Sequence, residues 1–228
     1  MKRTLSEQEK VRRDSLIQLR GLGINPYPAA MFGVDTTAKK IKENFKKGDV
    51  LEVVLAGRLM SRRIMGKASF AEIQDSSGRI QIYVNRDEIC EGEDKTGYNV
   101  VFKKLLDIGD IIGIKGSVFF TKVGEISIKV KELNVLTKSL RPLPLPKKDN
   151  DGKVHDAFTD PETRYRKRYV DLVVNPNVKE TFIKRTQLTN SMRSFLNKRG
   201  YLEVETPILQ PLYGGASARP FKTHHNTL

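Results

Sequence analysis

The sequence is poor in metal-binding and redox-active side chains, because its 228 residues include one cysteine and three histidines. The single cysteine, Cys90, excludes a disulfide within the chain, and a Cys/His zinc site is not expected from so few ligands. Long apolar runs are also missing, since no segment approaches the roughly 20 residues that span a bilayer. Residues 1–14 begin with basic side chains but lack the apolar core of a secretory signal. These absences indicate a reducing, cytoplasmic environment and no membrane partner.

Acidic side chains are scarce relative to basic ones. The chain has 41 Lys and Arg against 27 Asp and Glu, which gives a net charge of +14 at pH 7. Such an excess favours association with a polyanion. Because no membrane-spanning segment is found, we expect this polyanion to be nucleic acid.

Residues 1–48 are predicted to form a helical extension. Ser6 and Glu9 have the spacing of a capping box, in which each side chain satisfies a free amide at the start of a helix. Gly21 is expected to end this helix in a left-handed conformation. A second short helix is expected at residues 41–47. The apolar stripe of the first helix consists of Val11, Leu16, Ile17 and Leu19.

Residues 49–138 change to an alternation of apolar and polar side chains, which is typical of β-strands. A short helix at 98–106 separates the third strand from the fourth, and residues 76–78 and 122–124 form hairpin turns. This order predicts an OB-fold, a five-stranded barrel whose second and third strands often bind nucleic acid. The five strands are expected at residues 51–63, 67–75, 78–84, 110–122 and 124–136.

Alternation along the second and third strands separates core residues from outward ones. Ala71 and Ile73 belong to the core, so Phe70 must share the outer face with polar side chains. By the same parity Gln81 and Glu125 point outward. An outward aromatic ring can stack on an unpaired base with about 1–3 kcal/mol, and the two polar groups can bond base edges.

Other outward side chains support this interpretation, and burial of Phe70 is the alternative to it. Arg62 and Arg63 lie near the predicted face and can contact phosphate or stack on a base, and Tyr83 also points outward. The alternative is that a neighbouring loop or the N-terminal helix covers Phe70, which would then only pack.

A proline-rich, charged linker at residues 139–163 marks a domain boundary. The basic and aromatic segment 164–169 follows it, as either an RNA contact or a charged surface at a domain junction. A long helix is predicted at 178–199, then a strand around Leu202 and Val204 that Pro207 ends. The apolar positions of this helix are Phe182, Leu188, Met192, Phe195 and Leu196.

Three further features are weak candidates for sites. Residues 66–69 have the form of the end of a phosphate-binding loop but lack the upstream glycine at the required spacing. His224 and His225 are adjacent and would point in different directions, which favours a structural role. Cys90 lies beside glutamates that discourage the thiolate, so a reactive thiol is not expected.

Six segments together resemble the amino-terminal portion of bacterial-type class II lysyl-tRNA synthetases. The resemblance covers nearly the whole chain and lies in residues 19–28, 57–84, 136–144, 160–176, 200–209 and 214–228. It implies a mainly β fold with α, in which an OB-fold anticodon-binding domain at 49–138 follows the helical extension 1–48. After the hinge 139–163, residues 164–228 would be the incomplete start of the class II α+β catalytic domain. The linker at 144–162 departs from the family in being longer than its usual short hinge.

The resemblance also implies roles for particular residues. Phe70 would stack on an anticodon base, Arg63 and Gln81 would read the central uridine, and Glu125 would contact a neighbouring base. Gly215 would place its carbonyl near the α-amino group of lysine. Pro207 would belong to motif 1, which builds a homodimer interface.

The implied reaction is the ATP-dependent conversion of lysine to lysyl-adenylate, followed by transfer of the lysyl group to tRNA(Lys). ATP and Mg²⁺ would be held by motifs 2 and 3, which the family places beyond residue 228. We therefore expect no catalytic residue and no metal ligand within this chain, and no activation of lysine by it alone. The alternative function is a stand-alone OB-fold module that binds tRNA or single-stranded RNA without catalysis. A third is a paralogue that transfers lysine to a protein or lipid.

Overall fold

The computed structural model describes residues 4–148, 154–155, 157–208 and 223–224. The chain divides into two compact units, Met1–Phe158 and Thr159–Leu228, and each is described by itself. None of the helices in these described ranges is both long and apolar enough to cross a membrane.

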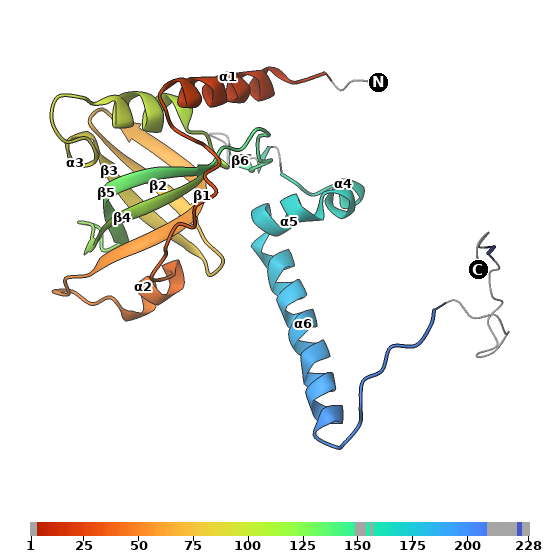
Figure 1. The fold of residues 1–228 in the computed structure, drawn as a ribbon. Coiled ribbons are helices and arrows are strands. Elements are labelled where there is room, and N and C mark those ends of the chain that lie inside the picture. Colours follow the sequence, from red (N-terminus) through yellow and green to blue (C-terminus); the bar gives the residue numbers. More distant parts are fainter. Residues whose placement is uncertain (1–3, 149–153, 156, 209–222, 225–228) are drawn as a thin grey trace. The chain divides into compact units, whose positions relative to one another are not determined.

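A closed five-stranded barrel forms the centre of the first unit (Figure 1). Its strand order is β1-β2-β3-β5-β4; β1 closes the barrel by pairing with β4, and β3 pairs with β5 in parallel. The predicted OB-fold with an N-terminal helix is therefore confirmed. The strands are β1 (Glu52–Met65), β2 (Ala68–Gln74), β3 (Arg79–Asn85), β4 (Ile111–Phe120) and β5 (Ile126–Thr137).

The alternation predicted from the sequence is present in the strands. In β2 and β3 every second side chain is buried, and Ile73, Ile80 and Ile82 have no exposed surface. These side chains fill one hydrophobic core together with residues of β4 and β5. The intervening residues of β2 and β3 therefore face outward, as the parity argument requires.

Two glycines of β4 allow close approaches that a side chain would block. A Cβ atom at Gly116 would lie 2.0 Å from the backbone oxygen of Lys129 on β5, at a point where the register of the two strands shifts. At Gly113 it would lie 2.6 Å from the ring of Phe32, so the segment that contains Phe32 packs directly on the strand.

Two short helices follow β3. The first is α3 (Arg86–Ile89), and the second, η1 (Gly97–Leu105), lies where a short helix was predicted at 98–106. The second is wound as a π-helix and buries Tyr98 and Phe102. The hydroxyls of Tyr98 and Ser69 share a hydrogen bond of 2.8 Å that ties η1 to β2.

Helix α1 (Glu7–Gly21) begins with the predicted capping box at Ser6 and Glu9. The predicted apolar stripe is partly wrong, because Val11 and Ile17 are 60% and 66% exposed. Hydrogen bonds from a polar side chain hold this helix instead of contacts made by Val11 and Ile17. The Arg12 guanidinium donates hydrogen bonds of 2.9 Å to the carbonyl oxygens of Ile108 and Ser139.

The ends of the first two helices also differ from expectation. Gly21 was predicted to take the left-handed conformation, but it lies inside α1, and Gly23 takes that conformation with φ of 77°. Helix α2 (Ala38–Asn44) begins earlier than the predicted 41–47, since the Thr37 side chain accepts a hydrogen bond from the Lys40 amide and caps it. Within the predicted linker, β6 (Lys147–Lys148) and β7 (Val154–His155) form a small antiparallel pair.

The second unit contains α4 (Pro161–Arg166), α5 (Arg168–Val174) and α6 (Pro176–Asn197). The long helix predicted at 178–199 is thus confirmed as α6, which begins slightly earlier. The strand predicted around Leu202 and Val204 is wrong, because residues 201–208 form no strand. A strand needs a hydrogen-bonded neighbour, and the described residues of this unit contain none.

Candidate nucleic-acid interface

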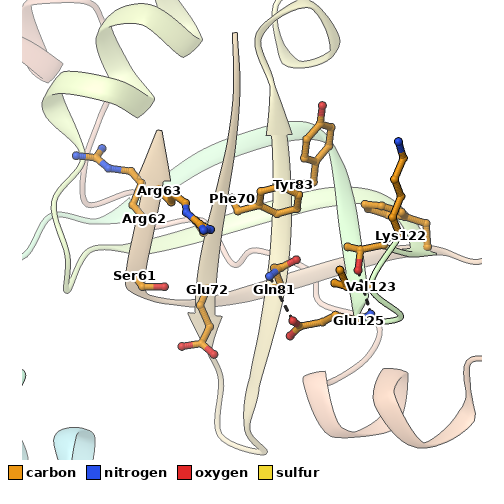
Figure 2. A pocket seen from close by; sticks show the side chains of 13 residues that line it. Ser61, Arg62, Arg63, Phe70, Glu72, Gln81, Tyr83, Lys122, Val123 and Glu125 are labelled. Carbon is orange, nitrogen blue, oxygen red and sulfur yellow. Dashed lines mark hydrogen bonds between the residues drawn. The ribbon is translucent and has the colours of Figure 1, made fainter. Parts of the chain in front are cut away.

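An open pocket of about 790 Å³ lies on the outer face of the barrel, over β1, β2, β3 and the β4–β5 hairpin (Figure 2). Arg63, Phe70, Gln81 and Glu125, the four residues predicted to read RNA in this part of the chain, all line it. The structure therefore brings together side chains that are up to 62 positions apart in the sequence. The other lining residues are Ser61, Arg62, Ala71, Glu72, Tyr83, Phe119, Thr121, Lys122 and Val123.

Three aromatic rings form a row in this pocket. The centroids of Phe70 and Tyr83 are 5.2 Å apart, and those of Tyr83 and Phe119 are 6.2 Å apart. Phe70 is half-buried, with one side against Tyr83 and the rest of the ring lining the pocket. It is not enclosed by a loop or by α1, so a face remains available for stacking.

A chain of hydrogen bonds orients the polar groups beside these rings. The buried Ser127 hydroxyl donates to Gln81 Oε1 at 2.8 Å, and Gln81 Nε2 donates to Glu125 Oε2 at 3.5 Å. Figure 2 shows the side chains of Gln81 and Glu125 pointing toward one another, joined by a dashed line. The pair therefore presents an amide donor and a carboxylate acceptor in fixed positions, the two kinds of group that the edge of a uracil base can bond.

The two arginines of β1 that line the pocket differ in their surroundings. Arg62 donates a hydrogen bond to the carbonyl oxygen of Phe102, and its guanidinium carbon lies 5.7 Å from the centroid of that ring. Burial lowers the pKa of Arg62, and the charges of Asp107 and Asp110 partly offset this effect. Arg62, which the sequence placed with Arg63 as a phosphate contact, is thus largely committed to η1. Arg63 makes no ion pair with any residue in the described ranges, which leaves its charge for a ligand.

Several pocket residues were not predicted from the sequence, among them Phe119 and Lys122. Val118 is buried in β4, so the same parity rule places Phe119 on the outer face, and that signal was available. Lys122 lies in the hairpin turn between β4 and β5, where alternation gives no information about side-chain direction. Tyr83 was recognised as outward but was given no role.

The basic segment 164–169 is mostly engaged in internal ion pairs. Arg164 and Arg168 both contact the buried carboxylate of Asp171, which also accepts a hydrogen bond of 2.7 Å from Asn175. Burial alone would raise the pKa of Asp171, but these hydrogen bonds and positive charges lower it. Of the two alternatives for this segment, the structure favours the structural one for these two arginines.

The three weaker candidate sites, at residues 66–69, Cys90 and His224–His225, are next compared with the structure where it describes them. Gly66 has φ of 64° in the turn between β1 and β2, while Ser69 is buried against Tyr98, so residues 66–69 form a hairpin and no phosphate loop. Cys90 is buried. His224 is exposed, and the described ranges hold no group of three or more His, Cys, Asp or Glu side chains that could bind a metal.

Two predicted residues of the second unit remain without a structural explanation. Pro207 lies in the exposed segment after α6. Gly215, like His225, lies outside the described residues.

Comparisons with known proteins match both halves of the chain. Residues 53–136 match the family of OB-fold nucleic acid binding domains, and residues 160–228 match the class II tRNA synthetases (D, K and N). A protein named lysine–tRNA ligase from Christiangramia forsetii is 66% identical over 98% of this chain. Proteins with the same name from Porphyromonas gingivalis and Azobacteroides pseudotrichonymphae are 61% and 57% identical over 98% of it. The chain spans 39% of the length of the first two relatives and 45% of the third.

Proposed function

We propose that this chain, which belongs with the lysine–tRNA ligases, is the part of such an enzyme that reads the anticodon of tRNA(Lys). The whole protein would convert lysine and ATP to lysyl-adenylate, with Mg²⁺, and then transfer the lysyl group to the tRNA. A cytoplasmic location and a homodimer built through motif 1, with Pro207 in it, are parts of the same proposal. So are the domain limits 1–48, 49–138, 139–163 and 164–228, and the contact of Gly215 with the lysine substrate.

The observation that carries the proposal is the composition of the pocket. A partly exposed ring at Phe70 lies beside the hydrogen-bonded pair of Gln81 and Glu125, and Arg63 adds a positive charge that pairs with no acidic side chain among the described residues. Single-stranded RNA is recognised when unstacked bases lie on aromatic rings and their edges meet polar side chains. All the required groups face one open pocket on a barrel of the fold that often does this.

The stacked base is proposed to be the central uridine of a UUU anticodon. Its ring would lie on Phe70, while Gln81 donates to a uracil carbonyl and Arg63 contacts the same base or its phosphate. Glu125 accepts a hydrogen bond from the imino group of a neighbouring uridine. Cytidine has no imino hydrogen at that position, so exchange of uridine for cytidine would leave a carboxylate without its donor.

The test is to measure how well the chain discriminates between RNA stem-loops with a UUU anticodon and with another anticodon. Phe70→Ala should weaken binding of the UUU stem-loop by about 1–3 kcal/mol and that of the other stem-loop much less. Phe70→Leu should lose nearly as much, because it keeps apolar bulk but not the flat ring. Phe182→Ala is the matched control, since that partly exposed ring lies in α6. Equal losses for both stem-loops would show that Phe70 only packs.

A further inference from the structure

A group of lysines lies beside the pocket, on and just after α2. Residues 38–47 contain five lysines and a single acidic side chain, Glu43, whose carboxylate pairs with Lys39 at 3.7 Å. All five lysines are exposed. Within the described ranges no ion pair is found for the other four, Lys40, Lys42, Lys46 and Lys47. We refer to these four as the α2 lysines.

Helix α2 is fixed to the barrel at both ends. At its start, the amide of Ala38 donates to the Asp75 carboxylate at 2.7 Å, and the amide of Lys39 donates to the Ser77 hydroxyl at 3.0 Å. At its end, the ring of Phe45 stacks on that of Phe120, with centroids 5.3 Å apart.

The inner face of the helix is apolar. Ala38, Ile41 and Phe45 are buried against the barrel, at the spacing that places side chains on one face of a helix. The lysines between and after them are therefore directed away from the barrel, on a support that does not need to reorganise when a ligand binds.

The two anchor points of α2 lie in the β2–β3 hairpin and the β4–β5 hairpin, whose strands or turn carry pocket residues. Asp75 and Ser77 belong to the turn between β2 and β3, a few residues from Gln81, and Phe120 directly precedes the pocket residues Thr121 and Lys122. The α2 lysines are thus held next to the Gln81–Glu125 end of the pocket. Figure 1 shows α2 at the opposite end of the barrel from α1.

We infer that the α2 lysines form a second RNA-binding surface, which contacts backbone phosphates of the strand whose bases enter the pocket. Lysine is suited to this role because its ammonium group is a flexible point charge that needs no fixed geometry at the phosphate. Phosphate contacts position an RNA but do not read its sequence. The surface therefore supplies affinity, and the pocket supplies specificity. This inference rests on the proposed function of the pocket.

The competing explanation is that the lysines only keep this face of the helix solvated. A lysine that binds a phosphate releases counterions from the RNA, and this release makes binding weaken as the salt concentration rises. A lysine that is only solvated releases none of them. Each phosphate contact on a single strand contributes about 0.7 to the slope of log K against log salt concentration. A solvated lysine that does not touch the RNA contributes only weakly, through the overall charge of the chain.

The experiment is a salt titration of binding between the whole chain and a stem-loop with a UUU anticodon. Replacing the four α2 lysines with alanine should lower the slope by about 1.4, which corresponds to two phosphate contacts. It should also weaken a stem-loop with another anticodon by a similar factor. A variant with arginine at all four positions should keep the slope, since the charges remain.

The control removes four charges near the other end of the barrel, by Lys10→Ala, Arg13→Ala, Arg20→Ala and Lys104→Ala, and should leave the slope nearly unchanged. Three of these side chains are exposed, Arg13 is half-buried, and Lys10 pairs with Glu7. An unchanged slope in the α2 variant, or an equal loss in the control, would overturn the inference. The proposed function has a separate readout, because Phe70→Ala tests discrimination between anticodons and the α2 variant tests sequence-independent affinity.

Discussion

The barrel and helix α6 differ in where their apolar side chains lie. In the barrel, Ile73, Ile82 and Ile128 have no exposed surface, and each strand finds hydrogen-bonded neighbours on both sides. In α6 no residue is buried, and Leu188, Met192 and Phe195 are 64%, 61% and 53% exposed. Both segments have apolar periodicity in the sequence. Periodicity alone therefore does not predict whether the apolar side chains are buried within the chain or left exposed.

The difference shows which of the two regions covers its own apolar side chains and which leaves them exposed. A closed barrel has no free strand edge and packs its apolar residues against each other. An amphipathic helix obtains most of its stability from a surface that covers its apolar face. The exposed stripe of α6 is consistent with the proposed motif 1 homodimer, whereas the barrel residues proposed to bind RNA all lie together among the described residues.

The largest effect is expected when equivalent side-chain truncations in the barrel and in α6 are compared. Ile82→Ala removes a fully buried side chain from the barrel core and should lower the free energy of unfolding by about 2–5 kcal/mol. In the monomer, Leu188→Ala removes an exposed side chain from α6 and should change the free energy of unfolding by no more than about 0.5 kcal/mol. Chemical denaturation followed by circular dichroism measures both. Similar losses in the two variants would mean that α6 is packed in solution as firmly as the core.

A smaller effect tests whether the pocket is held in shape by the barrel itself. Ser127→Ala removes the hydroxyl that donates to Gln81 Oε1 and should weaken binding of the UUU stem-loop by about 1 kcal/mol, or roughly fivefold. In a Gln81→Ala background the same change should have no further effect, because the oriented amide is already absent.

The matched control for this change lies in α6, where the Thr186 hydroxyl bonds the Phe182 carbonyl on an exposed surface. Thr186→Ala should leave RNA binding unchanged. A loss in Ser127→Ala that adds fully to that of Gln81→Ala would show that Ser127 does not act through Gln81.

The sequence predicted the barrel and most of the pocket because both depend on alternation in β-strands. Once Ile80 and Ile82 are assigned to the core, the outward direction of Gln81 follows from strand geometry alone. The same rule does not apply to α1, where Arg12 docks the helix through hydrogen bonds to two carbonyl groups, beside the single fully buried stripe residue Leu19. Nor could it reveal that Arg164 and Arg168 share Asp171, since a run of positive charge looks the same whether it is paired or free.

The most direct test of the account is to find which region touches the anticodon. A stem-loop with 4-thiouridine at the central anticodon position is bound to the chain and irradiated, and the crosslinked peptide is identified by mass spectrometry. The account predicts attachment within residues 68–85, which form β2 and β3 and include Phe70, Gln81 and Tyr83. Attachment within the helical residues 161–197 would contradict it.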